Sequence, residues 1–217
     1  MIEAVIFDMD GVLIDSEVEY INRFKNLFHK VGLTFSKEKA SQIIGSSSER
    51  TNELLHQWLG DTIDVSECWR LWHEELKVNP IDYSKLQVEG AYDLLATLKA
   101  KGYKIGLASA TELDRIYEQM EAAGLLPFFD AISSGHEVPH SKPDPGVYLK
   151  TMERLGVEPE QCIVVEDSFY GIQAGKSAGC YVIGRQVEMF NIDQRKADEL
   201  ITDLPQVLTI VERIQGV

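Results

Sequence analysis

Short apolar segments alternate with longer amphipathic segments through most of the chain. Continuous apolar runs predict buried strands, and they occupy residues 4–7, 103–108, 129–133, 162–165 and 181–183. Apolar residues at helical spacing predict helices between the strands, over residues 88–99, 112–123, 145–155 and 169–178, with a last helix that begins near Pro205. Strands that alternate with helices are typical of a parallel sheet covered by helices on both faces. The pattern therefore predicts an α/β fold.

Residues 16–85 interrupt this alternation. Helical spacing predicts helices over 17–31, 36–44, 49–59 and 66–76, and no strand is predicted in this stretch. Its tryptophans are interpreted as the core of a small helical bundle rather than as a cofactor site; they are Trp58, Trp69 and Trp72. Because the first strand needs partners, the economical arrangement is one core built from residues 1–15 and 86–217. An all-helical module, residues 16–85, is then inserted after the first strand.

Composition narrows the class of partner. The formal net charge is −14, which disfavours nucleic acid and anionic membrane surfaces, because both recruit Lys and Arg. The N-terminal sequence has no basic segment followed by a long apolar run, so we expect neither a signal peptide nor a membrane helix. We expect a cytoplasmic location. The cysteines are widely spaced and are interpreted as buried free thiols; they are Cys68, Cys162 and Cys180. We expect a monomer.

Polar residues follow the predicted strands where ligands bind in an open parallel sheet, beyond the carboxyl ends. Asp8 and Asp10 follow the first strand, and Ser109 follows the second. Glu166 and Asp167 follow the fourth strand, and Lys142 precedes the third helix of the core in the loop Ser-Lys-Pro-Asp-Pro. The fold should therefore bring four carboxylates, one hydroxyl and one lysine to a single edge of the sheet.

This set of groups suits phosphoryl transfer. Four crowded carboxylates cannot all stay ionised without a cation, and Mg²⁺ prefers oxygen ligands and substrate phosphate. Lys142 beside such a metal predicts an anion between them, for which a phosphoryl group is suited. Asp8 can attack phosphorus to give an aspartyl-phosphate, and Asp10 can protonate the leaving oxygen and then deprotonate the attacking water. A small phosphorylated metabolite is the predicted substrate.

Four segments resemble the ordered signatures of the haloacid dehalogenase-like superfamily, which has a Rossmann-like core. They are 7–17 (FDMDGVLIDSE), 107–109 (LAS), 141–143 (SKP) and 164–175 (VVEDSFYGIQAG). The resemblance implies that Asp8 is the nucleophile and a metal ligand, and that Asp10 is the acid/base with its carbonyl on the metal. It also implies that Ser109 and Lys142 bind phosphate and that Asp167, with Glu166, completes the Mg²⁺ site. The presence of Asp10 argues against dehalogenase chemistry.

Within that superfamily the chain resembles sugar-phosphate phosphatases and β-phosphoglucomutase. The resemblance implies that the helical module is a cap that closes over the substrate. A further hypothesis is that the cap opens at the two segments that connect it to the core, near 13–16 and 82–88. The position of a phosphate-binding cap arginine in the mutases is Ser48 here, and the position of a cap histidine is Tyr20. Both departures favour a phosphatase, with a mutase as the alternative. The cap loop that contains Gly45, Ser48 and Arg50 is the predicted specificity loop.

Other readings of the same residues stay open. A phosphorylation-switched regulatory domain and a binding protein without turnover are the alternatives outside enzymes. Asp15 and Ser16 are expected to cap the first cap helix, and Ser48 could be the N-cap of a later one. Asp144 is expected to be an N-cap, with Pro145 at the first helical position. Two loop histidines, at 136 and 140, are left out of the site, and the glycines at 171, 175 and 179 indicate close helix–sheet packing.

Overall fold

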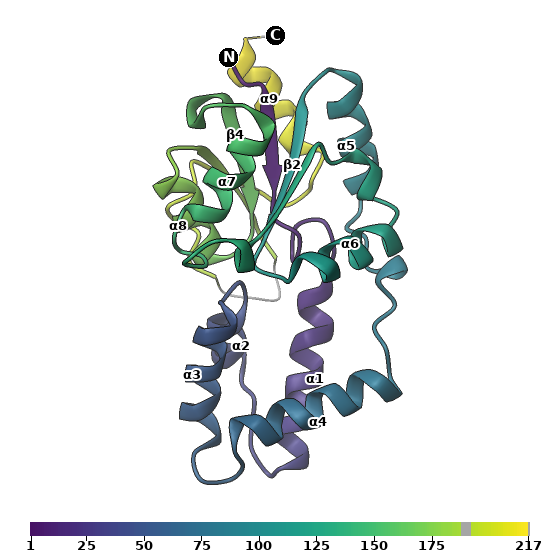
Figure 1. Ribbon diagram of the computed structural model, residues 1–217, viewed down its shortest axis with the longest axis vertical. Helices are drawn as coiled ribbons and strands as arrows, with labels where there is room; N and C mark the ends of the chain where they lie inside the picture. Colours follow the sequence, from purple (N-terminus) through teal and green to yellow (C-terminus); the bar gives the residue numbers. More distant parts are fainter. Residues whose placement is uncertain (188–191, 217) are drawn as a thin grey trace.

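A six-stranded parallel sheet forms the centre of the molecule (Figure 1). The computed structural model describes residues 1–187 and 192–216. Within these ranges the strand order is β3-β2-β1-β4-β5-β6. The strands are β1 (Ala4–Phe7), β2 (Lys104–Ser109), β3 (Ala131–Ser134), β4 (Cys162–Glu166), β5 (Tyr181–Arg185) and β6 (Glu199–Ile201). The predicted α/β fold is confirmed, and β1 lies at the centre of the order, between β2 and β4.

Helices cover both faces of the sheet, because the central strands are apolar on both sides. Val5 and Phe7 of β1 point into one apolar layer, and Ala4 and Ile6 point into the other. The first layer contains α5 (Ala91–Ala100), α6 (Leu113–Ala122) and α9 (Gln206–Gln215). The second contains α7 (Gly146–Leu155) and α8 (Phe169–Ser177). Figure 1 shows α7 and α8 on one side of the sheet and α5 and α6 on the other.

Four helices inserted between β1 and β2 pack together beyond the carboxyl ends of the strands. They are α1 (Ser16–Lys30), α2 (Lys37–Ile43), α3 (Ser48–Leu59) and α4 (Val65–Val78). Their apolar side chains form a separate core in which Phe24 lies 4.4 Å from Trp72 and 5.9 Å from Trp69, measured between ring centroids. We call residues 16–85 the cap; its exact boundaries stay a prediction.

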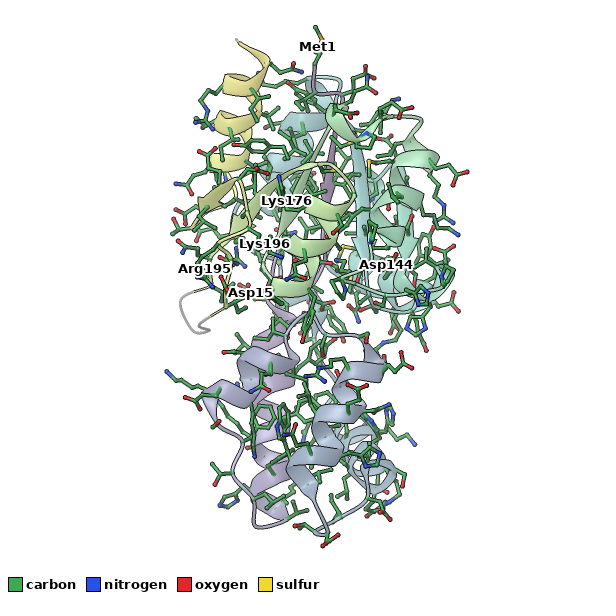
Figure 2. All side chains as sticks on the ribbon, turned by 90° about the vertical axis from the view of Figure 1, so that its left-hand side faces the viewer. Met1, Asp15, Asp144, Lys176, Arg195 and Lys196 are labelled. Carbon is green, nitrogen blue, oxygen red and sulfur yellow. The ribbon has the colours of Figure 1, made fainter. Side chains whose placement is uncertain are left out.

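The two chain segments that join the cap to the sheet lie side by side. The Asp15 amide donates to the Leu86 carbonyl at 2.7 Å, and the Val88 amide donates to the Leu13 carbonyl at 2.9 Å. Ile14 and Gln87 form an antiparallel bridge between these bonds. Figure 2 shows side chains filling both the sheet region and the cap, with Asp15 at the junction between them.

Several local predictions need correction. The strand β6 was not predicted, because it has three residues and only Ile201 among them is buried. Ser47, not Ser48, is the N-cap of α3, and its side chain accepts from the Arg50 amide. Pro145 takes the N-cap position of α7, where the Asp144 side chain accepts from the Gly146 amide at 2.8 Å.

The predicted capping of α1 is also wrong. Asp15 occupies the N-cap position, but its side chain accepts no capping hydrogen bond. It pairs instead with Arg185, at 3.1 Å, while the Ser16 hydroxyl donates to Asp10. The three cysteines are free and buried. No helix in the described part of the chain is both long and apolar enough to cross a membrane.

Candidate active site

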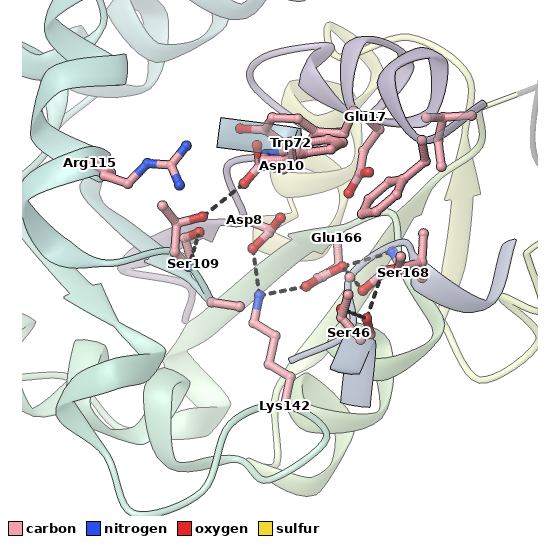
Figure 3. A pocket seen from close by; sticks show the side chains of 18 of the residues that line it. Asp8, Asp10, Glu17, Ser46, Trp72, Ser109, Arg115, Lys142, Glu166 and Ser168 are labelled. Atoms are coloured by element: carbon pink, nitrogen blue, oxygen red, sulfur yellow. Dashed lines mark hydrogen bonds and ion pairs between the residues drawn. The ribbon is translucent and has the colours of Figure 1, made fainter. Parts of the chain in front are cut away.

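A cavity of about 210 Å³ lies between the carboxyl ends of the strands and the cap. The strand-end residues Asp8, Asp10, Ser109 and Glu166 line it from the sheet side, together with Lys142. Residues of α1, of α4 and of the loop that contains Gly45 line it from the cap side. The fold therefore brings together most of the site residues predicted from the sequence, and Figure 3 shows them around this space.

Lys142 is the centre of the polar network. Its side chain is 3% exposed, and its ammonium group donates to Asp8 Oδ1 at 2.5 Å, to Glu166 Oε1 at 2.7 Å and to the Ala108 carbonyl at 3.1 Å. These three acceptors use its three N–H groups. Burial alone would lower the pKa of Lys142, but the charges of Asp8 and Glu166 raise it above its usual range. The lysine is therefore a fixed cation beside Asp8.

Glu166 has no oxygen left unpartnered. Its Oε1 accepts from Lys142 and from the Tyr148 hydroxyl at 2.9 Å, and its Oε2 accepts from the Asp167 amide and from the amide and hydroxyl of Ser168, each at 2.9 Å. Burial would raise the pKa of Glu166, but Lys142 and these donors hold it below its usual value. The Tyr148 ring also faces the Lys142 ammonium at 4.9 Å, a contact that the sequence did not predict.

Asp8, Glu166 and Asp167 form a buried carboxylate cluster, with one oxygen of each within 4.8 Å of the others. Asp167 Oδ2 is buried and accepts no hydrogen bond from any described residue. Burial raises the pKa of Asp8 to about 7 and that of Asp167 well above its usual value, and neighbouring carboxylates add to both effects. An unpartnered oxygen beside other carboxylates fits a hard cation such as Mg²⁺.

Asp10 is held from two sides. The Ser16 hydroxyl donates to its Oδ1, and the Thr111 hydroxyl donates to its Oδ2 at 3.3 Å. Burial raises the pKa of Asp10 above its usual value, although both hydroxyls act in the opposite direction. Ser16 begins α1, so the first residue of the cap orients this carboxylate. Only the position of Ser16 within the first signature pointed to this contact.

The cap loop meets the sheet at Gly45. Its φ is +66°, and a Cβ there would overlap the Ser168 side chain, so this close approach favours glycine. Gly45 and Ser46 line the cavity. Ser48 and Arg50 do not: both are exposed, and Arg50 pairs with Glu53 at 2.7 Å. The role of Ser48 and Arg50 in substrate binding stays a prediction, and their position outside the cavity does not support it.

The remaining lining residues were not predicted. On α1, Glu17, Ile21 and Phe24 recur at spacings of four and three, so they share one helix face, and all three line the cavity. This spacing was a usable signal, because it continues from the first signature. From α4 the cavity is lined by Trp69 and Trp72, and from the sheet side also by Thr111 and Arg115. The two loop histidines left out of the site, at 136 and 140, are exposed.

Comparison with known proteins agrees with this arrangement. Residues 5–185 match the model of the haloacid dehalogenase-like hydrolase family. A phosphorylated carbohydrates phosphatase from Thermotoga maritima is 35% identical over 82% of each chain. A hexitol phosphatase B from Escherichia coli is 32% identical over 81% of this chain and 79% of its own. Among solved structures, a β-phosphoglucomutase from Clostridium difficile superposes with a TM-score of 0.81 at 26% identity, covering 100% of this chain and 98% of its own.

The match extends across both the sheet and the cap, and it includes every strand end that carries a predicted site residue. A family match of this extent, with two phosphatases at or above 30% identity, supports an enzyme over the regulatory domain that the sequence left open. The chain belongs to the haloacid dehalogenase-like hydrolase family, as a hydrolase of the phosphatase kind.

Proposed function

We propose that the protein is a Mg²⁺-dependent phosphatase that releases phosphate from small phosphorylated metabolites through an aspartyl-phosphate on Asp8. The observation that carries this proposal is the buried network in which Lys142 joins Asp8 to Glu166. It holds a potential nucleophile beside a fixed cation, with Asp10 in the same cavity. This combination suits attack on an anionic phosphorus centre.

The proposed reaction has two steps. In the first, a carboxylate oxygen of Asp8 attacks phosphorus, the ester P–O bond breaks, and Asp10 gives its proton to the leaving oxygen. In the second, Asp10 takes a proton from water as the water oxygen attacks the aspartyl-phosphate, which releases inorganic phosphate and regenerates Asp8. The raised pKa of Asp10 supports its role as the proton donor. The Ser109 hydroxyl would donate to a phosphoryl oxygen, and Lys142, whose N–H groups are engaged by Asp8, Glu166 and Ala108, would attract the phosphoryl group as a fixed cation beside Asp8.

Asp8, Asp167 and the Asp10 carbonyl are the groups that would hold Mg²⁺. Bound there, the ion would offset charge on the phosphoryl oxygens and favour the ionised form of Asp8. Glu166 was also predicted as a ligand, but its oxygens already accept five hydrogen bonds. We therefore propose that Glu166 mainly fixes Lys142 and the start of α8, and that Asp167 Oδ2 is the principal free ligand atom.

A phosphorylated sugar or polyol is the proposed substrate class. The cavity volume, about 210 Å³, lies below the usual range of drug-sized ligand sites and suits a small molecule. Phe24, Trp69 and Trp72 give one wall an aromatic surface that can pack against carbon chains, and Glu17 can accept from hydroxyl groups. The two curated relatives described above are named for phosphorylated carbohydrates and hexitols, which agrees with this class.

A mutase is the second candidate, favoured by the structural match to a β-phosphoglucomutase. A mutase has to hold a second phosphate while the intermediate turns over. Arg50, the cap arginine nearest to the expected position, is exposed and does not line the cavity. Tyr20, at the position of the cap histidine, has its hydroxyl 3.1 Å from that of Tyr83. The two cap positions expected to hold a second phosphate in a mutase are therefore not equipped for it, which favours hydrolysis over transfer back to the sugar.

Phosphate release from a panel of about a hundred phosphorylated metabolites, with and without Mg²⁺, tests the proposal. We expect Mg²⁺-dependent release from a few sugar or polyol phosphates, and none from Asp8→Asn with its fold intact by circular dichroism. Substantial release by Asp8→Asn would remove Asp8 from the role of nucleophile. β-Glucose 1-phosphate with a bisphosphate primer is the mutase assay, and conversion to glucose 6-phosphate without net phosphate release would favour the mutase.

A further inference from the structure

Arg115 has no part in the mechanism described above, yet it lines the same cavity. Only two basic side chains line this cavity in the part of the chain that the structure describes, Lys142 and Arg115. Lys142 is buried and committed to Asp8 and Glu166. Arg115 lies in the first turn of α6, exposed at the rim of the cavity, four residues after Thr111. Figure 3 shows its guanidinium directed toward Asp10, and Lys142 reaching the cavity from a different side.

Arg115 lacks the carboxylate partner that most arginines of this chain have. The chain has eight arginines, and six form ion pairs with described carboxylates: Arg50, Arg70, Arg154, Arg185, Arg195 and Arg213. No described carboxylate lies in ion-pair contact with Arg115, whose polar neighbours are the Asp10 carboxyl group and the hydroxyls of Tyr20 and Tyr83. Asp10 is therefore a neighbour of Arg115 but not its ion-pair partner, so the guanidinium keeps N–H donors that an anionic group of the ligand can use.

The carboxyl group on the cap side of the cavity wall also bears on where that anion would lie. Glu17 enters the cavity from α1, and Figure 3 shows it on the opposite side from Arg115. Burial raises the pKa of Glu17 well above its usual value, and a carboxyl group offers a second anionic group on the substrate no attraction in either protonation state, whereas Arg115 attracts it. With the transferred phosphoryl group at Asp8, one orientation of such a substrate is therefore favoured. The planar fork of a guanidinium also matches the oxygens of a carboxylate or a phosphate with two hydrogen bonds.

We propose that Arg115 is a specificity-determining residue that binds a second anionic group, a carboxylate or a further phosphoryl group, on the part of the substrate that is not transferred. This inference rests on the proposed phosphatase activity and deepens it. The competing explanation is structural: Arg115 could only support the Tyr20–Tyr83 pair between α1 and the segment that returns from the cap. The two explanations differ in whether the effect of Arg115 depends on the charge of the substrate.

Matched substrate pairs separate them. Sorbitol 6-phosphate and 6-phosphogluconate share a six-carbon chain and differ by an alcohol against a carboxylate. Fructose 6-phosphate and fructose 1,6-bisphosphate differ by a second phosphoryl group. We expect the wild type to have a higher kcat/KM for the charged member of at least one pair. Arg115→Gln should lower kcat/KM for that member by about 10- to 100-fold, mainly through KM, because a hydrogen bond to a charged group is lost. The neutral member should change by less than about 3-fold.

Two further variants sharpen the test. Arg115→Lys keeps the charge and loses the fork, so its loss should fall between those of the wild type and Arg115→Gln. Arg70→Gln is the matched control, because Arg70 is an exposed cap arginine paired with Glu67 and Glu74, away from the cavity. It should leave both members of each pair unchanged. A charge effect confined to the first pair identifies a carboxylate as the second group, and one confined to the second pair identifies a phosphoryl group.

An equal loss for charged and neutral members in Arg115→Gln would overturn the inference and support the structural role. A wild-type preference for the neutral member of both pairs would overturn it as well. Asp8-dependent phosphate release from para-nitrophenyl phosphate with no charge preference would refute this inference alone. No release from any of these substrates, with Mg²⁺ present, would refute the proposed phosphatase and the inference together.

Discussion

Gly171 and Gly175 lie one helical turn apart on α8, and alanine at each should affect the protein differently. Alanine is favoured over glycine inside a helix by about 1 kcal/mol, so any loss must come from what the new Cβ meets. At Gly171 the Cβ would overlap both oxygens of the buried Glu166 carboxylate. At Gly175 it would lie 2.9 Å from a methyl group of Val182 and 3.2 Å from one of Val164. The first substitution disturbs the proposed site, and the second disturbs only packing.

The magnitudes follow from these contacts. Ordinary contact needs 3.4 Å or more, so in Gly171→Ala the Glu166 carboxylate has to move by more than a C–C bond length. That displacement breaks its 2.7 Å bond to Lys142 and its 2.9 Å bond to Tyr148. Breaking a buried ion pair costs about 3–5 kcal/mol, which the helix preference reduces to about 2–4 kcal/mol. Overpacking in Gly175→Ala costs about 1–3 kcal/mol, leaving a net loss of about 0–2 kcal/mol.

Activity should separate the two variants more sharply than stability does. A displacement of about 1 Å in a positioning group can cost about 100-fold in rate, so Gly171→Ala should lose at least that factor in Mg²⁺-dependent phosphate release. Gly175→Ala should stay within about 3-fold of the wild type, because no site residue moves. Urea unfolding of both variants gives the stability values and shows that each is folded in the assay. Near-wild-type activity in Gly171→Ala would show that the position of Glu166 does not control the position of Lys142.

Three further predictions address single contacts. Tyr148→Phe keeps the ring beneath the Lys142 ammonium but removes the hydrogen bond to Glu166, so it should lower the free energy of unfolding by about 1 kcal/mol; a Tyr148→Leu variant no less stable than Tyr148→Phe would show that the ring contributes nothing. Hydrogen bonds from Arg154 and from the Ser134 amide hold the pKa of Glu137 below 4.5. The ionised Glu137 side chain therefore contributes to the free energy of unfolding above that pH, and this contribution is lost as the pH falls through the folded-state pKa. Glu137→Gln should therefore cost up to about 1 kcal/mol in urea unfolding at neutral pH and progressively less in acid; a cost that does not change with pH would contradict this. Mg²⁺ at 100 times its Kd should raise the free energy of unfolding by about 2.7 kcal/mol, whereas Asp167→Asn should be more stable than the wild type without Mg²⁺ and gain little from it; equal stabilisation of both proteins would place the metal elsewhere.

The sheet was predictable because burial on both faces leaves a clear trace in the sequence. Strands such as Ala4–Phe7 are apolar at every position, and an acidic or hydroxyl residue marks where each of the site-forming strands ends. Parallel strands place these ends at one edge of the sheet, so the sequence alone predicted that Asp8, Ser109 and Glu166 lie close together. The edge strand β6 left no such trace, because Leu200 is 45% exposed and only one of its three residues is buried.

Partners that depend on side-chain direction were not predictable. Tyr148 lies 18 residues from Glu166, and nothing in its helix pattern distinguishes a tyrosine that packs on apolar neighbours from one that also donates to a carboxylate. The position of Arg115 in the cavity was equally unpredictable, because a charged residue in the first turn of an amphipathic helix normally faces solvent. Gly45 of the predicted cap loop lines the cavity, whereas Ser48 and Arg50 do not, because the side chains that face the cavity depend on how α2 and α3 meet.

The junction with the cap limits where the cap can pivot. Hydrogen bonds tie Leu13 to Val88 and Asp15 to Leu86, and the Gly11 amide donates to the Ile14 carbonyl at 2.8 Å. These bonds, with the Leu13 amide donating to the Met9 carbonyl at 2.9 Å, fix residues 11–15 and 86–88 to each other and to the segment that follows β1. Both segments therefore belong mechanically to the sheet. We infer that cap opening, if it admits substrate, occurs at Ser16 and at 82–85 rather than throughout the two predicted hinges.

Ser16 links movement of the cap to the orientation of Asp10. Its side chain is fully buried and donates to Asp10, so rotation of α1 away from the sheet would pull on the hydroxyl that orients the proposed acid/base. Closure and orientation of Asp10 are therefore coupled through one side chain. Hydrogen exchange can separate this view from a looser hinge, because the Asp15 and Val88 amides should exchange as slowly as those of the central strands. Fast exchange at both amides would place the pivot within the paired segments and remove the reason for the coupling.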